Sequence, residues 1–325
     1  MPQRVQLPQT LEGKTAIVAG AAGFVPSYLC EFYLGLGCKV IGLDNFVTGS
    51  KSNIEILSKY PNFEFHEQDI SVGLPDFKGQ NIDYIFSLAS PASPIDFKII
   101  PLEIMKVNSV GTWNLLELAK EKHARFLEAS TSEVYGDPEI HPQVEEYVGS
   151  VNPVGPRSCY DESKRFAEAL TMTYYRQFNV DTRIVRIFNT YGPRMRPDDG
   201  RVIPNFINQA LANEDITVYG DGSQTRSFCF VTDLVQGIHN VMHTNIHTPF
   251  NIGNPDEYSI KEAAEYIVKV LGSQSKIINL PLPEDDPRQR RPNINKLQAI
   301  SDYKPEVTFD VGLKKTAEYF QSLRK

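Results

Sequence analysis

A tyrosine and a lysine four positions apart, Tyr160 and Lys164, are the residues whose types and spacing most directly suggest chemistry. Apolar residues recur every three or four positions from Ser158 to Phe178, which predicts a helix that places both side chains on one face. A tyrosine ionises at about pH 10, and a neighbouring ammonium stabilises its phenolate. The pair is therefore a candidate base, although a tyrosine packed on a lysine stem gives the same spacing.

Hydroxyl and carboxyl side chains precede this pair in the run Thr131, Ser132 and Glu133, which follows the predicted strand Arg125–Ala129. Open α/β sheets bind their ligands at the carboxyl ends of the strands. At such an edge Thr131 offers a hydroxyl beside the tyrosine, and Glu133 offers a carboxylate. The order of the two motifs therefore strengthens the interpretation of the pair as catalytic.

A second motif, the pair Gly20 and Gly23, stands between the first predicted strand and a helix. Glycines there permit a tight turn and close approach of a pyrophosphate to the helix N-terminus. Asp44 follows the second strand, where a carboxylate accepts hydrogen bonds from an adenosine ribose and repels a 2′-phosphate. Asp69 follows the third strand, near the expected position of the adenine. Together these residues predict NAD, in preference to NADP, as the cofactor.

Pro26 departs from this motif, because a glycine at its position would let the helix pack closely on the sheet. Proline is tolerated in the first turn of a helix, where its missing N–H would be unpaired anyway. A local repacking and an altered NAD affinity are both compatible with the sequence, and we expect the repacking.

Short β-branched runs alternate with helical patterns from Lys14 onward, which predicts βαβ units and a parallel sheet. We expect a Rossmann-type doubly wound α/β domain over residues 1–190 and a smaller α/β substrate lobe over 191–325, partly interleaved with the first. The predicted strands are Thr15–Ala19, Lys39–Leu43, Phe63–His66, Tyr84–Leu88, Arg125–Ala129, Asp181–Ile187 and Ile216–Tyr219. The predicted helices are Leu102–Lys122, Ser158–Phe178 and Ser259–Leu271.

The overall composition limits the partners of this chain. A net charge of -7 argues against a general binder of nucleic acid or anionic membranes. The 4 cysteines lack metal-ligand spacing, so we expect reduced thiols and no metal site. We find no apolar run long enough for a membrane span, and we expect a cytoplasmic protein.

The chain resembles the extended short-chain dehydrogenase/reductase family, and within it the UDP-glucuronic acid decarboxylases, also called UDP-xylose synthases. The similarity runs from about Lys14 to Ser322. The segments that carry it are 88–93, 130–138, 152–157 with 159–165, 186–195 and 220–226. The resemblance implies an NAD domain, a lobe for a UDP-sugar, and a homodimer formed through the two long helices.

Residue by residue, the resemblance assigns cofactor and substrate roles. The cofactor-binding positions are Gly20, Gly23, Phe24, Val25, Asp44, Asn45, Thr48, Gly49, Asp69, Ile70, Leu88 and Ser90, joined by Tyr160 and Lys164. The substrate-binding positions are Lys106, Asn189, Arg201, Tyr219, Gln224, Arg226 and Arg290. The catalytic positions are Thr131, Ser132, Glu133, Tyr160, Lys164 and Arg290. Arg226 also has a chemical reason, since a guanidinium pairs with phosphate oxygens.

The implied reaction begins with Tyr160 taking the proton of the sugar 4-hydroxyl while hydride leaves carbon 4 for NAD. The resulting β-keto acid loses carbon dioxide, carbon 5 is protonated with help from Glu133, and hydride returns to carbon 4. Arg290 is expected to face the substrate carboxylate.

The sequence leaves other functions open. A nucleotide-sugar 4,6-dehydratase shares the oxidation step, but it usually carries an aspartate where this chain has Ser132. A 4-epimerase is disfavoured because most epimerases lack the glutamate at position 133. A non-catalytic protein that binds NAD or a nucleotide sugar would be free to lose the set Thr131, Glu133, Tyr160 and Lys164.

Overall fold

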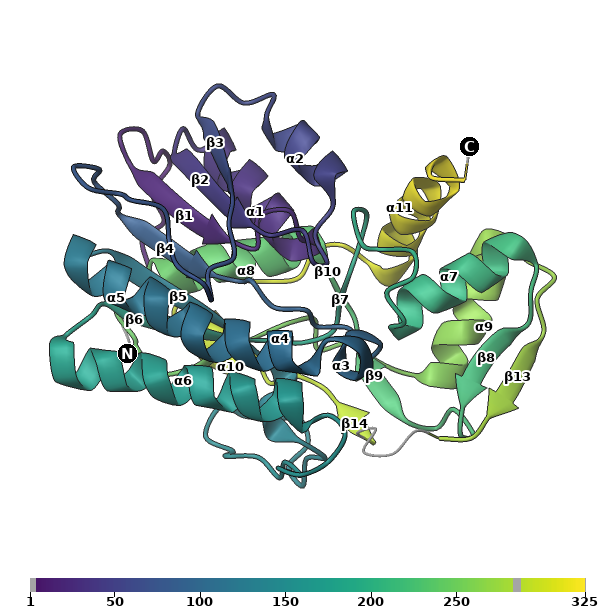
Figure 1. Ribbon diagram of the computed structural model, residues 1–325. Coiled ribbons are helices and arrows are strands. Elements are labelled where there is room, and N and C mark those ends of the chain that lie inside the picture. The colour runs from purple at the N-terminus through teal and green to yellow at the C-terminus, as the bar shows by residue number, and fades with distance from the viewer. Residues whose placement is uncertain (1–3, 283–287, 325) are drawn as a thin grey trace.

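The computed structural model describes residues 4–282 and 288–324 and is built on a seven-stranded parallel sheet (Figure 1). The strand order is β11-β6-β5-β4-β1-β2-β3. The strands are β1 Thr15–Ala19, β2 Lys39–Asp44, β3 Phe63–Glu67, β4 Tyr84–Ser87, β5 Arg125–Thr131, β6 Thr182–Ile187 and β11 Phe250–Ile252. The predicted Rossmann-type sheet is confirmed, and the order reverses between β1 and β4, where such sheets bind ligands.

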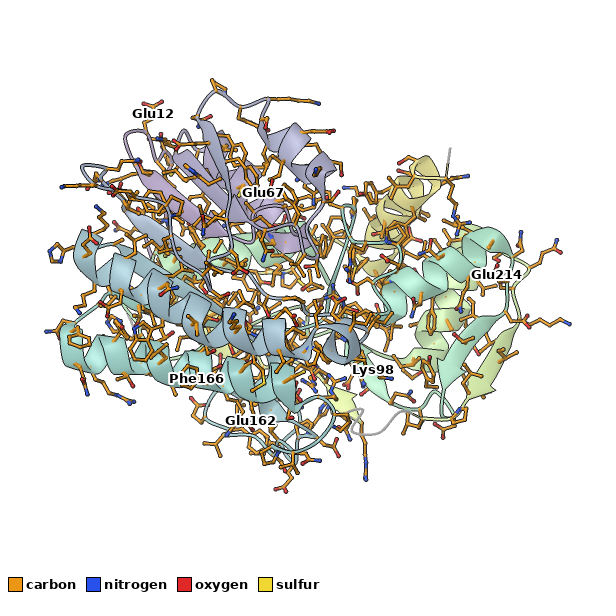
Figure 2. The ribbon with its side chains drawn as sticks, viewed as in Figure 1. Glu12, Glu67, Lys98, Glu162, Phe166 and Glu214 are labelled. Carbon is orange, nitrogen blue, oxygen red and sulfur yellow. The ribbon has the colours of Figure 1, made fainter. Side chains whose placement is uncertain are left out.

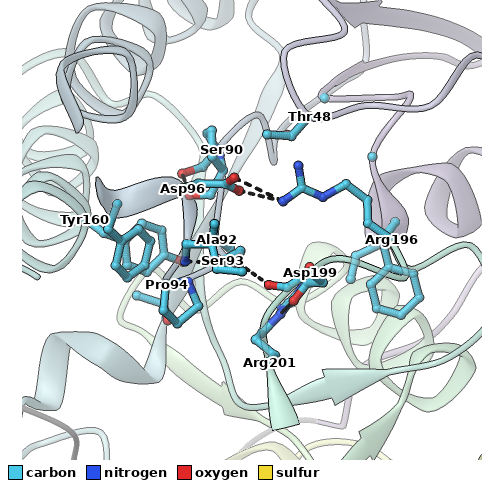
Figure 3. A pocket seen from close by; sticks show the side chains of 18 of the residues that line it. Thr48, Ser90, Ala92, Ser93, Pro94, Asp96, Tyr160, Arg196, Asp199 and Arg201 are labelled. Atoms are coloured by element: carbon cyan, nitrogen blue, oxygen red, sulfur yellow. Dashed lines mark hydrogen bonds and ion pairs between the residues drawn. The ribbon is translucent and has the colours of Figure 1, made fainter. Parts of the chain in front are cut away.

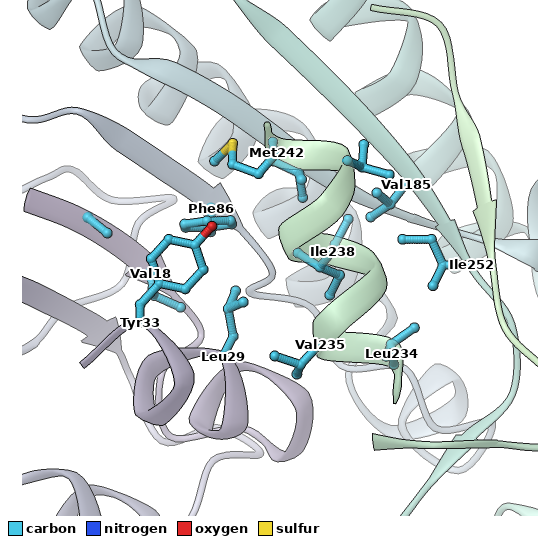
Figure 4. Packing of buried hydrophobic residues seen from close by; sticks show 14 of the residues in the cluster. Val18, Leu29, Tyr33, Phe86, Val185, Leu234, Val235, Ile238, Met242 and Ile252 are labelled. Atoms are coloured by element: carbon cyan, nitrogen blue, oxygen red, sulfur yellow. The ribbon is translucent and has the colours of Figure 1, made fainter. Parts of the chain in front are cut away.

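Side chains that alternate along each strand serve two separate cores. In β1, Val18 faces the cluster under helices α1 (Phe24–Gly35) and α8 (Val231–Met242), whereas Ile17 faces the cluster under α5 (Thr112–Lys122) and α6 (Ser158–Phe178). Figure 4 shows the first cluster, where Tyr33, Phe86 and Ile238 meet. Because helices cover both faces of the sheet, its strands carry apolar side chains on both faces.

The predicted helix Leu102–Lys122 is present but interrupted. It begins as α4 Pro101–Lys106, passes through a π-helical turn over Val107–Gly111 and continues as α5. A side chain at Gly111 would lie 2.9 Å from Ile70, so the turn presses closely on the loop after β3. The helix Ser158–Phe178 has the predicted bounds.

The second lobe is a smaller α/β unit, seen in Figure 1 to the right of the sheet. Helices α7, α9 and α11 bury one apolar cluster with Ile216, Val218 and Phe228. The helices are α7 Val202–Ala212, α9 Ile260–Leu271 and α11 Phe309–Ser322, and the strands are β8 Ile216–Tyr219 and β13 Ile277–Leu280.

Short elements connect the lobes and close the site. The strands are β7 Thr190–Tyr191, β9 Thr225–Ser227, β10 Cys229–Phe230, β12 Glu257–Ser259 and β14 Gln289–Arg290. The helices are α2 Lys51–Leu57, α3 Asp96–Ile99 and α10 Asn295–Gln298, with a 3-10 turn, η2, at Ser132–Tyr135.

No single cut in the chain separates the two lobes. Residues beyond 190 return to the first lobe as α8 and as β11, which pairs with β6. The pattern did not predict β11, because three residues are too few to show a period. The four cysteines are free and buried. Within the described residues, no helix has the length and apolar character that spanning a membrane requires.

Candidate active site

A large cavity opens at the carboxyl edge of the sheet and continues between the lobes. Its volume is about 1,600 Å³, whereas a site for one small ligand holds roughly 300–1,000 Å³. The loops after β1, β2, β4 and β5 line one end, and α7, β8 and β9 line the other. The cavity therefore has room for two ligands placed end to end.

Nearly all the residues predicted for the site line this one cavity. On the cofactor side they are Gly20, Gly23, Phe24, Val25, Asp44, Asn45, Thr48, Asp69, Ile70, Leu88 and Ser90. The catalytic set Thr131, Ser132, Glu133, Tyr160 and Lys164 and the substrate set Lys106, Asn189, Arg201, Tyr219, Gln224 and Arg226 line it as well.

Two predicted residues, Gly49 and Arg290, are not among those that line the cavity. A side chain at Gly49 would lie 2.8 Å from Asp44 Oδ1 and 2.7 Å from Ala22, so this glycine allows close packing behind the carboxylate. Arg290 is 1% exposed and lies behind Glu133. Its guanidinium is directed at a protein carboxylate, and its expected direct contact with a substrate carboxylate stays a prediction.

The glycine-rich loop has the shape that a dinucleotide requires. Gly20 has a φ of 86°, and a side chain there would lie 2.9 Å from the backbone of Ala89. Gly23 caps α1 without a side-chain bond, which leaves the backbone N–H groups of the first turn facing the cavity region. Pro26 is the third residue of α1, where an N–H has no intrahelical partner, so the helix begins normally.

Asp44 is the last residue of β2, and Asp69 follows β3. Both line the same end of the cavity. Asp44 accepts hydrogen bonds from the backbone N–H groups of Ala22 (3.0 Å) and Phe46 (2.7 Å), while burial raises its pKa. Burial acts to raise the pKa of Asp69 too, but hydrogen bonds from the hydroxyl and N–H of Ser71 hold it below the usual range. The glycine loop and these carboxylates fit the pyrophosphate and adenosine of NAD.

Tyr160 lies at the middle of the cavity, in the first turn of α6. Its ring stacks on Phe97 with centroids 4.9 Å apart, and the residue is 6% exposed. Burial raises the pKa of the phenol well above its usual value; the Thr131 hydroxyl acts against this by hydrogen bonding, and the charge of Glu133 adds to it. The structure thus places the Thr131 hydroxyl near the phenol, and the catalytic partnership of the two residues stays a prediction.

Lys164 has an unexpected partner. Its Nζ lies 3.1 Å from Glu128 Oε1 and donates a hydrogen bond to the carbonyl of Ala129 at 2.8 Å. We expected this ammonium to serve Tyr160, which is one turn away on the same helix. In this structure the positive charge of Lys164 is instead paired with the carboxylate of Glu128 in β5.

Glu133 is held by two guanidinium groups. Its carboxylate lies 2.6 Å from Arg157 Nη2 and 3.2 Å from Arg290 Nη1. Burial acts to raise the pKa of Glu133, but the charges of Arg290 and Arg157 outweigh burial and hold it well below the usual range. A carboxyl of such low pKa stays ionised, so Glu133 would help at carbon 5 as a carboxylate, and that expected help stays a prediction.

At the sugar side, an ion pair and a hydrogen bond connect the segment after β4 with the segment before α7, and a second ion pair lies within the latter (Figure 3). Arg201 Nη2 lies 2.8 Å from Asp199 Oδ2, and Arg196 Nη2 lies 2.9 Å from Asp96 Oδ2. Ser93 donates a hydrogen bond to the carbonyl of Asp199. These contacts fix Arg201 beside Tyr160, close enough for its charge to lower the pKa of the phenol.

The second lobe supplies the residues farthest from the sheet. Gln224 donates a hydrogen bond to the carbonyl of Tyr219 at 2.8 Å, and Tyr219 is 43% exposed. Arg226 is buried and its charge also lowers the pKa of Glu133. The substrate end is thus joined electrostatically to the catalytic carboxylate.

Sequence reasoning missed Glu128, Arg157 as a partner of Glu133, and Phe97. Glu128 carries a signal that could have found it, since a charged residue inside an apolar strand requires a partner. Arg157 and Phe97 carry no comparable signal, because each meets its partner only through the fold. No cluster that could hold a metal ion occurs in residues 4–282 and 288–324.

Comparisons with known proteins agree with this geometry. The family model for the NAD dependent epimerase/dehydratase family matches residues 16–253. UDP-glucuronic acid decarboxylase 1 of Danio rerio is 48% identical over 307 residues, which cover 94% of this chain and 72% of the relative. UDP-glucuronic acid decarboxylase 4 of Arabidopsis thaliana is 50% identical over 297 residues, covering 91% and 66%. The crystal structure of a UDP-glucuronic acid 4-epimerase from Bacillus cereus, in complex with UDP-glucuronic acid and NAD, is 28% identical, with a TM-score of 0.85 and coverage of 95% and 99%.

Proposed function

The chain belongs to the NAD dependent epimerase/dehydratase family, and from that premise we propose that it converts UDP-glucuronic acid to UDP-xylose and carbon dioxide. The observation that carries the proposal is the cluster of Glu133, Arg157 and Arg290 next to Tyr160 in a cavity with room for two ligands. Relatives at 46–50% identity, all named UDP-glucuronic acid decarboxylases, support the same reaction. The enzyme would be a carboxy-lyase, since NAD is regenerated in each cycle.

The chemistry begins at the sugar 4-hydroxyl. Bound NAD supplies the acceptor, and later the donor, of one hydride. Tyr160 takes the hydroxyl proton, and Thr131 holds the phenol in place by its hydrogen bond. The carbonyl formed at carbon 4 is beta to the carboxylate. When the bond between carbon 5 and the carboxyl carbon breaks, its electron pair moves into the enolate and carbon dioxide leaves.

We propose that Glu133 and the two arginines bound to it assist the protonation of carbon 5. Because Glu133 is ionised, we propose that it orients a water molecule that delivers the proton to carbon 5, while a proton from solvent neutralises the hydroxide that remains. Arg157 and Arg290 keep that carboxylate fixed, and Arg290 acts through Glu133 instead of touching the substrate. Ser132 cannot act as the acid that expels a 6-hydroxyl, so a 4,6-dehydratase fits less well.

A turnover assay tests this function. The NAD-loaded protein is incubated with UDP-glucuronate, and carbon dioxide and UDP-pentose are quantified against the Tyr160→Phe variant. We expect equal amounts of both products and a loss of about 10²–10⁴-fold in the variant. Conversion of UDP-glucuronate to its 4-epimer without carbon dioxide would contradict the proposal, as would turnover restricted to neutral nucleotide hexoses.

We also propose that the protein is a cytoplasmic homodimer that pairs through α4, α5 and α6. These helices lie side by side on one flank of the molecule in Figure 1, and Phe166 projects from α6 in Figure 2. Leu102, Trp113 and Phe166 are 73%, 50% and 44% exposed, which leaves apolar surface for a partner. Analytical ultracentrifugation should find a dimer that Phe166→Glu dissociates and that Val311→Glu, at an exposed position of α11, does not. A monomeric wild-type protein would contradict the proposal.

A further inference from the structure

Glu128 is a charged residue in an apolar strand. It is fully buried in β5 between Leu127 and Ala129, which are themselves buried. Its Oε1 lies 3.1 Å from Lys164 Nζ, and its Oε2 has no hydrogen-bond partner within the described part of the chain. Burying a carboxylate is costly unless it is fully paired, and here the pairing is incomplete.

The contact with Glu128 limits the number of hydrogen bonds that Lys164 can donate to other groups. An ammonium has three N–H donors, and two of them are directed at Glu128 and at the carbonyl of Ala129. One donor remains for a cofactor ribose or for Tyr160. The negative charge of Glu128 also offsets the positive charge that Lys164 presents to the phenol, which is one helical turn away.

We propose that Glu128 is a positioning residue that holds Lys164 and balances its charge, and so sets the pH range in which Tyr160 acts as a base. The inference rests on the proposed function only in requiring that Tyr160 remove a proton. The other groups that act on the phenol are Thr131, Glu133, Asp161 and Arg201. None of them contacts Glu128 among the hydrogen bonds and ion pairs of the described residues, so Glu128 can be changed separately from them.

The sign of the effect follows from the charges. A nearby positive charge favours the phenolate and lowers the pKa of Tyr160, whereas a negative charge behind it weakens that influence. Glu128→Gln removes the negative charge, while its amide oxygen can still accept a hydrogen bond from Lys164 Nζ. Lys164 then acts on Tyr160 unopposed, so the pKa of Tyr160 should fall.

The experiment compares the pH dependence of kcat/KM for UDP-glucuronate in the NAD-loaded wild type and in Glu128→Gln. The acidic limb of this profile reports the base in the enzyme before substrate binds. We expect that limb to move to lower pH by about half a unit to one unit. An unmoved limb, or one displaced to higher pH, would overturn the inference.

A matched control is Glu168→Gln, which removes a mostly buried carboxylate in α6. Glu168 pairs with Arg186 at 2.8 Å and does not contact Lys164, so this variant should lose stability without moving the limb. If Glu128→Gln does not fold, Glu128→Asp withdraws the carboxylate by one methylene and should give a smaller displacement in the same direction. An equal displacement in Glu168→Gln would assign the effect to general loss of buried charge.

A second readout separates this inference from the proposed function. If the wild type releases no carbon dioxide, the proposed function fails, and ionisation of Tyr160 is then followed by ultraviolet absorbance of the NAD-loaded protein against Tyr160→Phe. The inference predicts that the Tyr160 phenolate forms at lower pH in the Glu128→Gln background than in the wild type. Identical titration in both backgrounds would overturn it.

Discussion

The two ends of the cavity hold their carboxylates by different means. At the cofactor end, Asp44 is bound by backbone N–H groups of Ala22 and Phe46, both within 22 positions of it. At the sugar end, Glu133 is bound by Arg157 and Arg290, which are 24 and 157 positions away. Burial raises the pKa of Asp44, whereas burial of Glu133 is outweighed by the two guanidinium charges. The carboxylate at the cofactor end is therefore held by backbone groups, whereas the carboxylate at the reacting end is held by side chains that the tertiary structure brings to it.

This difference explains which end carries the specificity of the reaction. A loop that uses backbone N–H groups can serve any enzyme that takes the same dinucleotide, because few of its side chains are specified. A carboxylate fixed by two distant arginines exists only when both lobes are folded and joined. The comparison predicts that variants at the sugar end affect stability and turnover together, whereas those at the cofactor end affect mainly NAD binding.

The largest effect is expected from Arg290→Met. Removing one partner of a buried ion pair leaves Glu133 partly uncompensated, so the free energy of unfolding should fall by about 2–4 kcal/mol. Turnover should fall by roughly 10²-fold, because Glu133 loses its fixed position. Denaturant unfolding and the carbon dioxide assay measure the two effects. Arg291→Met is the control, because the Arg291 side chain is 39% exposed and its ion pair with Glu257 is long, at 3.8 Å. An equally large loss in this variant would contradict the comparison.

A smaller effect, confined to binding, is expected from Asp44→Asn at the other end. Loss of charged hydrogen bonds to a ribose costs about 1.5–3 kcal/mol, so the Kd of NAD should rise roughly 10–100-fold. With saturating NAD, kcat should stay within about twofold of the wild type. Calorimetry of NAD binding and steady-state kinetics test this. A large loss of kcat at saturating NAD would show that the two ends are not separable.

The two carboxylates should also respond oppositely to acid. The low pKa of Glu133 gives stability that is present above the ordinary value of 4.5 and is lost as the pH falls through the folded value. The raised pKa of Asp44 has the opposite sign, because its contribution is complete below the ordinary value of 3.8 and is lost as the pH rises. From pH 6 toward pH 3, wild type should lose stability relative to Glu133→Gln and gain it relative to Asp44→Asn. Unfolding curves across this range that show the same sign for both would break the comparison.

The smallest effect is expected from Pro26→Gly, which restores the glycine of the dinucleotide loop. Because α1 begins normally with proline at its third position, the Kd of NAD should change by less than about threefold. The variant should lose about 1 kcal/mol of stability, since glycine makes the unfolded chain more flexible. Thermal unfolding and NAD titration measure these values. A tenfold gain in NAD affinity would show that the proline perturbs the loop.

The cofactor end could be predicted from sequence because its signals are local. Gly20, Gly23 and Asp44 lie at fixed offsets from strands whose periodicity is plain, and the structure places all three on one cavity. Tyr160 and Lys164 were found for the same reason, since a helix of predictable bounds aligns them. The seven-stranded sheet was predicted except for β11, whose three residues come from the far end of the chain.

The residues of the reacting end could be identified from the sequence, but the contacts between them could not. Glu133 and Arg290 were both selected, yet nothing in the sequence shows that the arginine binds the glutamate and does not face the cavity. The partner of Lys164 was missed for a similar reason. Glu128 and Lys164 are 36 positions apart, and their contact arises only when α6 packs on β5.

The most direct test of decarboxylation through a carbonyl at carbon 4 is one incubation in deuterium oxide. The NAD-loaded protein converts UDP-glucuronate, and the product is examined by mass spectrometry and NMR. We predict UDP-xylose with one deuterium, at carbon 5, because the enolate left by carbon dioxide takes a hydron from solvent. A UDP-hexuronate that retains its carboxylate, or a UDP-pentose without deuterium, would contradict the proposed reaction.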